Sequence, residues 1–301
     1  MNTATRREMA ARLRSAPGVI AALDQSGGST PETLRAYGIA KSAYSREDEM
    51  LELIHGMRVR IMTSPTFSSE SVIGAILFEN TMDRSIAAKS IPAFLWEDRG
   101  IFSFLKVDSG RETERDGVQL MKPMPNLGDL LERALEKGFL GTKMRSVVRA
   151  ASATGIAAIV AQQFDLASAI LTTGLIPIIE PEVLVDSPDK AAAEVILVEH
   201  ILRNLAGLQD ETQVILKLTL PTQRDLYAPL VEHPKVARVF ALSGGYGLKV
   251  ACEKLSENTG MIGSFSRALV EDLVVSMHDA EFDDHLSQNI QQIYAASVRK
   301  G

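Results

Sequence analysis

Eight apolar segments of strand length recur along this 301-residue chain, with helical patterns between them. Most are apolar on both faces, which is typical of parallel strands that helices cover. This alternation constrains the fold more than any other feature, because it predicts a mostly parallel sheet flanked by helices. The segments are residues 19–24, 72–79, 102–107, 139–145, 175–183, 213–220, 237–244 and 261–266.

The intervening helical patterns are equally regular. In residues 47–62, apolar side chains recur at helical spacing and form one stripe. Residues 126–138 begin at Asn126, a capping residue type, and end at Gly138. Further helices are expected at 155–174, 189–207 and 281–298.

Eight strands alternating with helices, without a linker rich in glycine, proline or serine, predict a single (β/α)8 TIM barrel. We expect residues 1–301 to form one domain, with no separate second domain. The alternative is a doubly wound open sheet, which usually has fewer strands and often a glycine-rich first turn. The GGYG segment at 244–247 does not match that GxGxxG pattern.

Composition excludes several classes of protein. Apolar residues make up 46% of the chain, enough for a large core, and the net charge of −6 argues against a nucleic-acid or anionic-membrane binder. No run approaches ~18 uninterrupted apolar residues, so no membrane span is expected. Cys252 is the only cysteine, which suits a reducing cytoplasm. The five histidines show no HExxH or close ligand pair, so we expect no metal site.

Charged residues gather where the expected strands end, the position of the active site in (β/α)8 barrels. Lys143 and Arg145 are two residues apart, as are Glu180 and Glu182, so each pair points to one face of its strand. Burying such charges costs several kcal/mol per ion unless they pair, so their density favours an active site. Other polar residues at strand ends are Asp24, Lys106, Asp108, Lys217, Ser243, Ser264 and Arg267.

Lys217 stands alone in the apolar segment VILKLTLP. An apolar wall and nearby cations both disfavour the ammonium form, so they lower the pKa of a lysine. A neutral lysine amine can form a Schiff base with a ketone. Lys106 and Lys143 have comparable positions, so this reasoning leaves three candidates.

Two segments rich in small residues are typical of phosphate-binding loops. One contains Ser243, Gly244 and Gly245, and the other contains Ser26 and Ser29 beside two further glycines. Either could be an ordinary turn between strand and helix. Arg267 has the fork geometry that binds phosphate with two hydrogen bonds. Together they predict a small-molecule ligand with a phosphate at each end.

Seven segments, in order, resemble the class I (Schiff-base) fructose-bisphosphate aldolases, and most closely their short bacterial form. They are ALDQSGGS, FLKVD, GTKMRS, PIIEPEV, VILKLTLP, LSGGY and SFSRAL, and the likeness extends from about residue 18 to 267. The resemblance implies reversible cleavage of fructose 1,6-bisphosphate to dihydroxyacetone phosphate and glyceraldehyde 3-phosphate. It implies a lyase of glycolysis and gluconeogenesis that needs no cofactor.

The resemblance also implies roles for individual residues. Lys217 matches the Schiff-base lysine, and Asp24 matches the carboxylate that handles the C4 hydroxyl proton. Glu180 matches the acid/base for carbinolamine dehydration, with Lys143 as its charged neighbour. We expect Glu182 to pair with Lys143 and hold it in place.

The phosphate sites follow in the same way. The first phosphate is expected on Ser243, Gly244 and Arg267, with Gly245 beside them. The second is expected on Ser26, Ser29 and Lys106. Arg145 is a candidate substrate contact without an assigned role.

Some questions stay open at this stage. The sequence ends in SVRKG without the C-terminal tyrosine of the longer animal-type enzymes, and Tyr294 falls within an expected helix. The group that protonates the enamine carbon is therefore unassigned. Alternatives are an aldolase for tagatose or sedoheptulose bisphosphate, a barrel isomerase or decarboxylase with clamping lysines, and a non-catalytic sugar-phosphate-binding barrel. A homo-oligomer is expected on general grounds.

Overall fold

Eight parallel strands form the main sheet of the computed structural model, which describes residues 2–300. The first and last strands of this sheet meet where the Ala22 N–H donates to the Phe265 carbonyl at 3.2 Å, so the sheet is a nearly closed barrel. The predicted (β/α)8 fold is confirmed, and the open doubly wound sheet is excluded. Met1 and Gly301, the ends of the expected domain, lie outside the described residues. In sheet order the strands are β1 (Val19–Ala22), β2 (Val72–Leu77), β5 (Phe102–Lys106), β7 (Gly141–Val148), β8 (Ile176–Val183), β9 (Val214–Thr219), β10 (Val236–Leu242) and β11 (Met261–Gly263).

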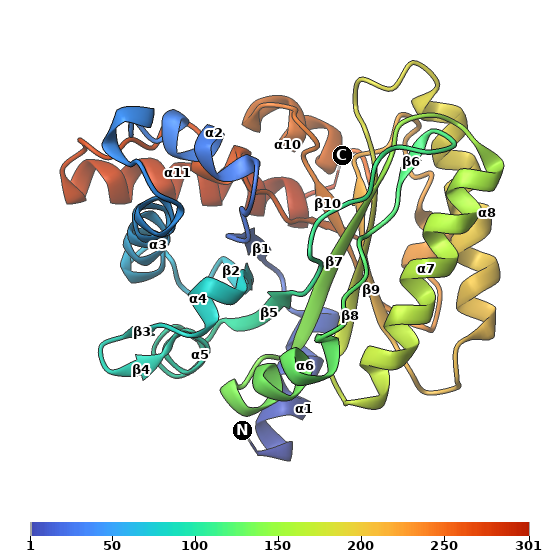
Figure 1. Cartoon of the computed structure of the whole chain (residues 1–301), viewed down its shortest axis with the longest axis horizontal. Helices are drawn as coiled ribbons and strands as arrows, with labels where there is room; N and C mark the ends of the chain where they lie inside the picture. The colour runs from blue at the N-terminus through green and yellow to red at the C-terminus, as the bar shows by residue number, and fades with distance from the viewer. Residues whose placement is uncertain (1, 301) are drawn as a thin grey trace.

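Helices surround the barrel (Figure 1). The five helices expected from the sequence are present as α3 (Glu47–Thr63), α6 (Leu127–Lys137), α7 (Ala153–Thr172), α8 (Lys190–Gly207) and α11 (Asp279–Val298). Asn126 holds the N-cap position of α6, but its side chain makes no capping hydrogen bond, whereas Gly138 ends the helix with a φ of 91°. Four further helices were not expected from the sequence: α1 (Thr3–Ser15), α2 (Ser29–Ala36), α5 (Ile91–Arg99) and α10 (Leu248–Ser256).

The remaining elements are short. A two-stranded antiparallel hairpin of β3 and β4 precedes α5, and β6 pairs antiparallel with β7. These elements are β3 (Ser85–Ile86), β4 (Lys89–Ser90), β6 (Val118–Gln119), α4 (Glu79–Met82), α9 (Ala228–Val231) and the 3₁₀ turns η1 (Lys41–Ala43) and η2 (Ala268–Val270).

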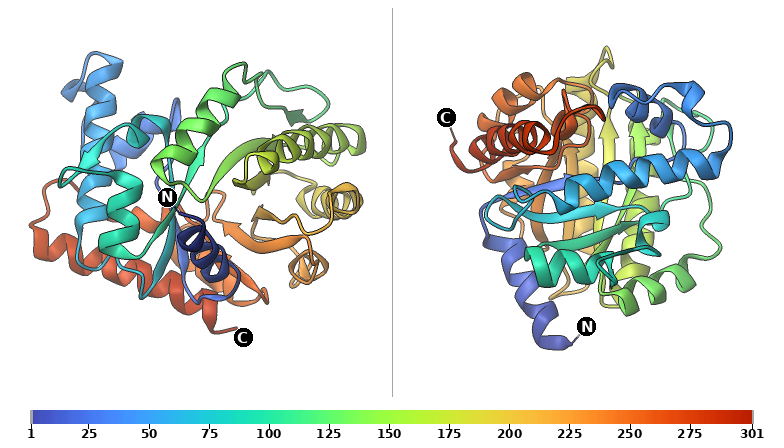
Figure 2. Two further views of the ribbon diagram at one scale, coloured as in Figure 1. Left: turned by 90° about the horizontal axis from the view of Figure 1, so that it is seen from below. Right: turned by 90° about the vertical axis from the view of Figure 1, so that its left-hand side faces the viewer.

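Helix α1 closes the barrel at the amino ends of the strands, as the view from below shows (Figure 2, left). Met9 and Leu13 of this helix join the apolar cluster inside the barrel. The Arg6 guanidinium donates to the carbonyls of Phe139, at 2.9 Å, and Leu140, at 3.2 Å, just before β7. The floor of the barrel is thus both apolar and firmly tied to the strands.

The side chains that the strands point into the barrel change from apolar to charged along the strand direction. On β5, the buried Phe102 and Phe104 precede Lys106, and on β9 Ile215 precedes Lys217. Because alternate residues of a strand share one face, the charged residue follows the apolar ones along the barrel interior. The carboxyl half of the interior is therefore the place to look for chemistry.

Helix α7 is the one helix, within residues 2–300, that is long and apolar enough by composition to cross a membrane, with a mean hydropathy of 1.4. No such helix was expected from the sequence. In the fold, α7 packs on β7, β8 and α8, and its buried residues include Ile156, Ile159 and Phe164. Its position in the barrel wall accounts for its apolar composition.

Candidate active site

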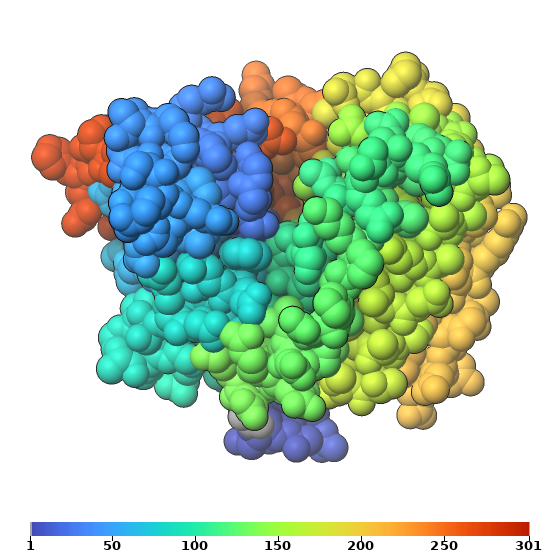
Figure 3. Space-filling view, in the orientation of Figure 1, coloured from blue at the N-terminus to red at the C-terminus, as the bar shows by residue number. Residues whose placement is uncertain are grey.

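A cavity of about 810 Å³ opens at the carboxyl ends of the strands. The surface is hollowed there between the segment after β1, shown in blue, and the green loop after β5 (Figure 3). All but one of the predicted site residues line it, and the exception is Gly245. Those in the lining are Asp24, Ser26, Ser29, Lys106, Lys143, Arg145, Glu180, Glu182, Lys217, Ser243, Gly244 and Arg267.

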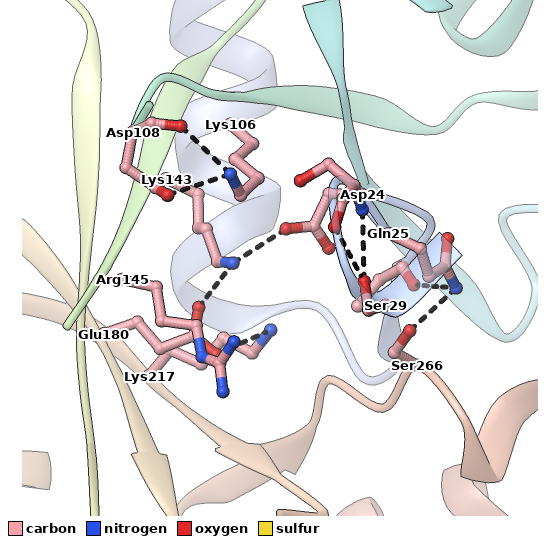
Figure 4. Close-up of polar contacts among 12 residues, drawn as sticks. Asp24, Gln25, Ser29, Lys106, Asp108, Lys143, Arg145, Glu180, Lys217 and Ser266 are labelled. Carbon is pink, nitrogen blue, oxygen red and sulfur yellow. Dashed lines mark hydrogen bonds and ion pairs between the residues drawn. The ribbon is translucent and has the colours of Figure 1, made fainter. Parts of the chain in front are cut away.

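Lys143 lies between two carboxylates at the centre of this cavity (Figure 4). Its Nζ is 2.7 Å from Asp24 Oδ2 and 2.7 Å from Glu180 Oε2. Burial alone would lower the pKa of Lys143, but the two carboxylates outweigh it and raise the pKa above 10.5. Lys143 is therefore held as a permanent ammonium.

Lys217 is equally buried but more weakly paired. Its nearest carboxylate oxygen, Glu180 Oε1, is 3.4 Å away, and the side chain is almost inaccessible to water. Burial lowers the pKa of Lys217 below 10.5, and although Glu180 opposes that shift, the Lys143 charge adds to it. Lys106, the third candidate, is 2.9 Å from Asp108 Oδ1. The structure thus separates three lysines that sequence position left equivalent.

Asp24 and Glu180 are ionised despite their burial. Desolvation would raise the pKa of each, but Lys143 and Lys217 outweigh it and bring both pKa values below the ordinary range. Glu180 touches both ammonium groups, so it can pass a proton to or from a group bound on Lys217.

Glu182 pairs with Arg145 and not with Lys143, so the predicted contact was wrong. In the β7–β8 register, Arg145 stands beside Glu180, whereas Lys143 stands beside Ile178, two residues lower in the barrel. The longer Arg145 side chain reaches Glu182 near the rim, and Lys143 stays with the carboxylates below. Burial opposes the charge of Arg145, yet Glu182 and Glu180 raise its pKa.

The loop after β10 has the shape expected of an anion-binding turn. Gly244 has a φ of 64°, and a Cβ there would lie 2.7 Å from Val185 Cγ1, so no larger residue fits. A Cβ on Gly245 would lie 3.7 Å from Arg267 Nη2, which places that guanidinium beside the loop. The loop therefore brings two glycines beside an arginine, a combination suited to binding an anion.

The loop after β1 is a compact turn at the start of α2. The Ser29 hydroxyl donates to the Ser26 carbonyl at 3.0 Å and accepts from the Ser26 N–H at 3.2 Å. Lys106, their predicted partner, also faces the cavity, but its Nζ donates to both Oδ1 and the carbonyl of Asp108. The second predicted phosphate site therefore has a cation whose charge is already compensated.

Several supporting residues were missed from the sequence. Gln163 of α7 accepts from the Glu180 N–H at 2.9 Å and donates to Ser146, and Gln25 joins the loops after β1 and β11 through Ser266 at 2.7 Å. The fully buried Arg58 of α3 donates to the Gln25 carbonyl. A glutamine within an apolar helix and an arginine on an apolar stripe were the available signals. Within residues 2–300, no group of three or more His, Cys, Asp or Glu side chains could hold a metal.

A (β/α)8 barrel with a buried, weakly paired lysine beside a carboxylate at its mouth has the architecture of a Schiff-base enzyme. The family model for "Fructose-bisphosphate aldolase class-I" matches residues 7–225. Two curated relatives named fructose-bisphosphate aldolase class 1 are each 50% identical: that of Synechocystis sp., over 97% of both chains, and that of Clostridium acetobutylicum, over 95% of this chain and 97% of the relative. The chain belongs to the class I fructose-bisphosphate aldolase family.

A solved structure supports the fold. The fructose-bisphosphate aldolase of Plasmodium falciparum superimposes with a TM-score of 0.78 at 20% identity, covering 100% of this chain and 97% of that one. The likeness establishes a shared barrel across the whole described chain.

Proposed function

We propose that this chain reversibly cleaves fructose 1,6-bisphosphate to dihydroxyacetone phosphate and glyceraldehyde 3-phosphate through a Schiff base on Lys217. The observation that carries the proposal is the contrast between two buried lysines. Lys143 lies 2.7 Å from two carboxylate oxygens, whereas Lys217 lies 3.4 Å from Glu180, its only ion-pair partner among the described residues, and has a lowered pKa. Membership of the aldolase family supports the same reaction.

Each step has a group suited to it. Glu180 first takes a proton from the Lys217 ammonium, and the neutral amine attacks the C2 carbonyl. Glu180 then returns that proton to the hydroxyl of the carbinolamine, which leaves as water and gives a protonated imine. Asp24 then accepts the C4 hydroxyl proton, the C3–C4 bond breaks, and its electron pair moves into the imine to give an enamine. Glyceraldehyde 3-phosphate leaves first. Protonation of the enamine at C3 and hydrolysis of the imine release dihydroxyacetone phosphate.

The charged neighbours keep these groups in their working states. Lys143 holds Asp24 and Glu180 ionised, and Arg145 with Glu182 forms the wall above them. For the first phosphate, the loop of Ser243, Gly244 and Gly245 would supply backbone N–H groups and Arg267 a guanidinium. Ser26, Ser29 and Lys106 would face the second.

The setting of the enzyme is part of the proposal. We infer a single catalytic domain over residues 1–301, a cytoplasmic location in glycolysis and gluconeogenesis, and a homo-oligomeric state. The net charge of −6 supports a small-molecule substrate and no nucleic-acid or membrane partner.

The test is a cleavage assay on chelator-treated protein with three substrates: fructose 1,6-bisphosphate, tagatose 1,6-bisphosphate and sedoheptulose 1,7-bisphosphate. We expect the highest kcat/KM for the fructose compound and none for Lys217→Met. A higher kcat/KM for another ketose would reassign the substrate. Ligand binding without turnover would instead identify a sugar-phosphate-binding barrel.

A further inference from the structure

The six basic side chains that line the cavity fall into two groups. Four of them make ion pairs with carboxylates: Lys106, Lys143, Arg145 and Lys217. The other two, Arg111 and Arg267, make no ion pair within residues 2–300. Arg267 is exposed, whereas Arg111 is half-buried. A half-buried guanidinium without a counter-ion has an energetic cost that an anionic ligand would remove.

The two unpaired arginines lie on different sides of the barrel mouth. Arg267 follows β11 and borders the Gly245 loop, whereas Arg111 belongs to the loop that follows β5. In the order of the eight strands, β5 stands opposite β10, the strand that carries the Gly245 loop. A substrate with a phosphate at each end, lying across Lys217, therefore has one unpaired guanidinium on either side.

The backbone of Arg111 is firmly held. It bridges Met121 in a short antiparallel ladder, in which the Glu112 N–H donates to the Leu120 carbonyl at 2.9 Å. Met121 is fully buried and is fixed to α7 by two hydrogen bonds of 2.9 Å with the Gln162 amide.

The guanidinium of Arg111 is held much less tightly. Its only hydrogen bond among the described residues is a 3.5 Å contact with Gln119 Oε1. Burial, Arg145 and Arg149 lower the pKa of Arg111, and the opposing charges of Glu182 and Asp108, which pair with Arg145 and Lys106, do not make up for that shift. The backbone of Arg111 is therefore fixed, while most N–H donors of its guanidinium have no partner among the described residues. This arrangement is typical of an arginine that binds an anionic ligand.

We propose that Arg111 binds the second phosphate of the substrate, the one remote from the Gly245 loop, and thereby sets the preference for a bisphosphate over a monophosphate. The inference rests on the proposed function and deepens it. It also resolves a difficulty in the predicted second site, where Asp108 already compensates Lys106. Arg111 supplies the positive charge that Ser26 and Ser29 lack.

The test compares fructose 1,6-bisphosphate with fructose 1-phosphate, which lacks the second phosphate. In Arg111→Met we expect kcat/KM for the bisphosphate to fall by about 10- to 100-fold, chiefly through KM, because a charge-assisted pair of hydrogen bonds is lost. The kcat/KM for the monophosphate should be unchanged. Arg111→Lys, which keeps the charge but loses the fork, should lie between these values.

Arg149→Met is the matched control. Arg149 is near enough to interact electrostatically with Arg111, but it pairs with Glu114 at 3.3 Å and does not line the cavity. The control removes the same charge and should leave both substrates unaffected. An equal loss for both substrates in Arg111→Met, no loss for either, or the same loss in Arg149→Met would overturn the proposal.

Borohydride trapping with dihydroxyacetone phosphate separates this inference from the proposed function. Arg111→Met should trap the adduct as well as the wild type does, because that product carries only the first phosphate. Trapping in the wild type with an unchanged bisphosphate preference in Arg111→Met would overturn the Arg111 assignment alone. Absence of trapping in the wild type would overturn the proposed function and this inference with it.

Discussion

The floor and the mouth of the barrel are built from the same strands, but the floor is lined by apolar side chains and the mouth by charged ones. At the floor, Phe104, Ile178 and Ile215 pack with α1 in a buried apolar cluster. Two residues further along β5, β8 and β9, the same interior holds Lys106, Glu180 and Lys217. The apolar and the charged environments are thus only two residues apart along each strand.

The difference shows how the fold divides stability from chemistry. Full burial of an aliphatic or aromatic side chain stabilises the folded state by about 1.5–3 kcal/mol. Each buried ion costs several kcal/mol unless it is well paired. The apolar packing at the floor offsets the free-energy cost of burying charges at the mouth. Lys217 can remain weakly paired because apolar packing holds the preceding part of its strand in place.

Lys217→Met should have the largest effect on activity of all the substitutions at the barrel mouth. We expect cleavage to fall by at least about 10⁴-fold, because no other group supplies the covalent intermediate. The folded state should be as stable as the wild type or more so, since an imperfectly paired buried ammonium is replaced by an apolar chain. Turnover and thermal unfolding measure both. Near-normal turnover would contradict the mechanism.

Lys143→Met should have the next largest effect, and it should damage both properties. Activity should fall by about 10²- to 10³-fold, because Asp24 and Glu180 lose the charge that keeps them ionised. Stability should fall by about 3–5 kcal/mol, since two buried carboxylates lose their shared partner. Urea unfolding measures the loss of stability. A Lys143→Met variant as stable as Lys217→Met would contradict the view that Lys143 stabilises the two carboxylates.

Ile215→Ala tests the floor on the same strand as Lys217. Removing this fully buried side chain should cost about 2–5 kcal/mol of unfolding free energy. Below the unfolding transition, kcat/KM should match the wild type, because the mouth is untouched. A large loss of activity in the folded variant would show that floor and mouth are not separable.

The smallest expected effect is a shift in the titration of Lys217, followed by trace acetylation across pH with peptide mapping. Only the neutral amine reacts, so reactivity should rise through a pKa below 10.5 at Lys217 and above 10.5 at Lys143. Glu180→Gln removes a carboxylate that raises the pKa of Lys217, so its midpoint should move to lower pH. Lys143→Met removes a cation that lowers it, so the midpoint should move to higher pH. Shifts in the same direction would contradict the assigned electrostatics.

Much of this arrangement could be predicted because it is local. The apolar segments and their terminal charges predicted the barrel, and the spacing of Glu180 and Glu182 predicted that both face the cavity. Pairing between strands could not be predicted. The stagger of β7 against β8 decides that Arg145, and not Lys143, reaches Glu182, and nothing within either segment encodes that stagger.

Arg111 was missed for a different reason. It lies in DSGRETERDG, a polar segment typical of an exposed loop. Only the ladder with Met121 and the anchoring by Gln162 turn that loop inward. The sequence also does not show which cations pair with carboxylates. Arg111 can be recognised as unpaired only after the ion-pair partners of the other cations in the cavity are known.

The most direct test of the central claim is borohydride reduction with dihydroxyacetone phosphate in the presence of a chelator, followed by peptide mass mapping. We expect one reduced adduct, on Lys217, and none on Lys106 or Lys143. An adduct on Lys143, or no adduct on any lysine of the metal-free protein, would contradict it.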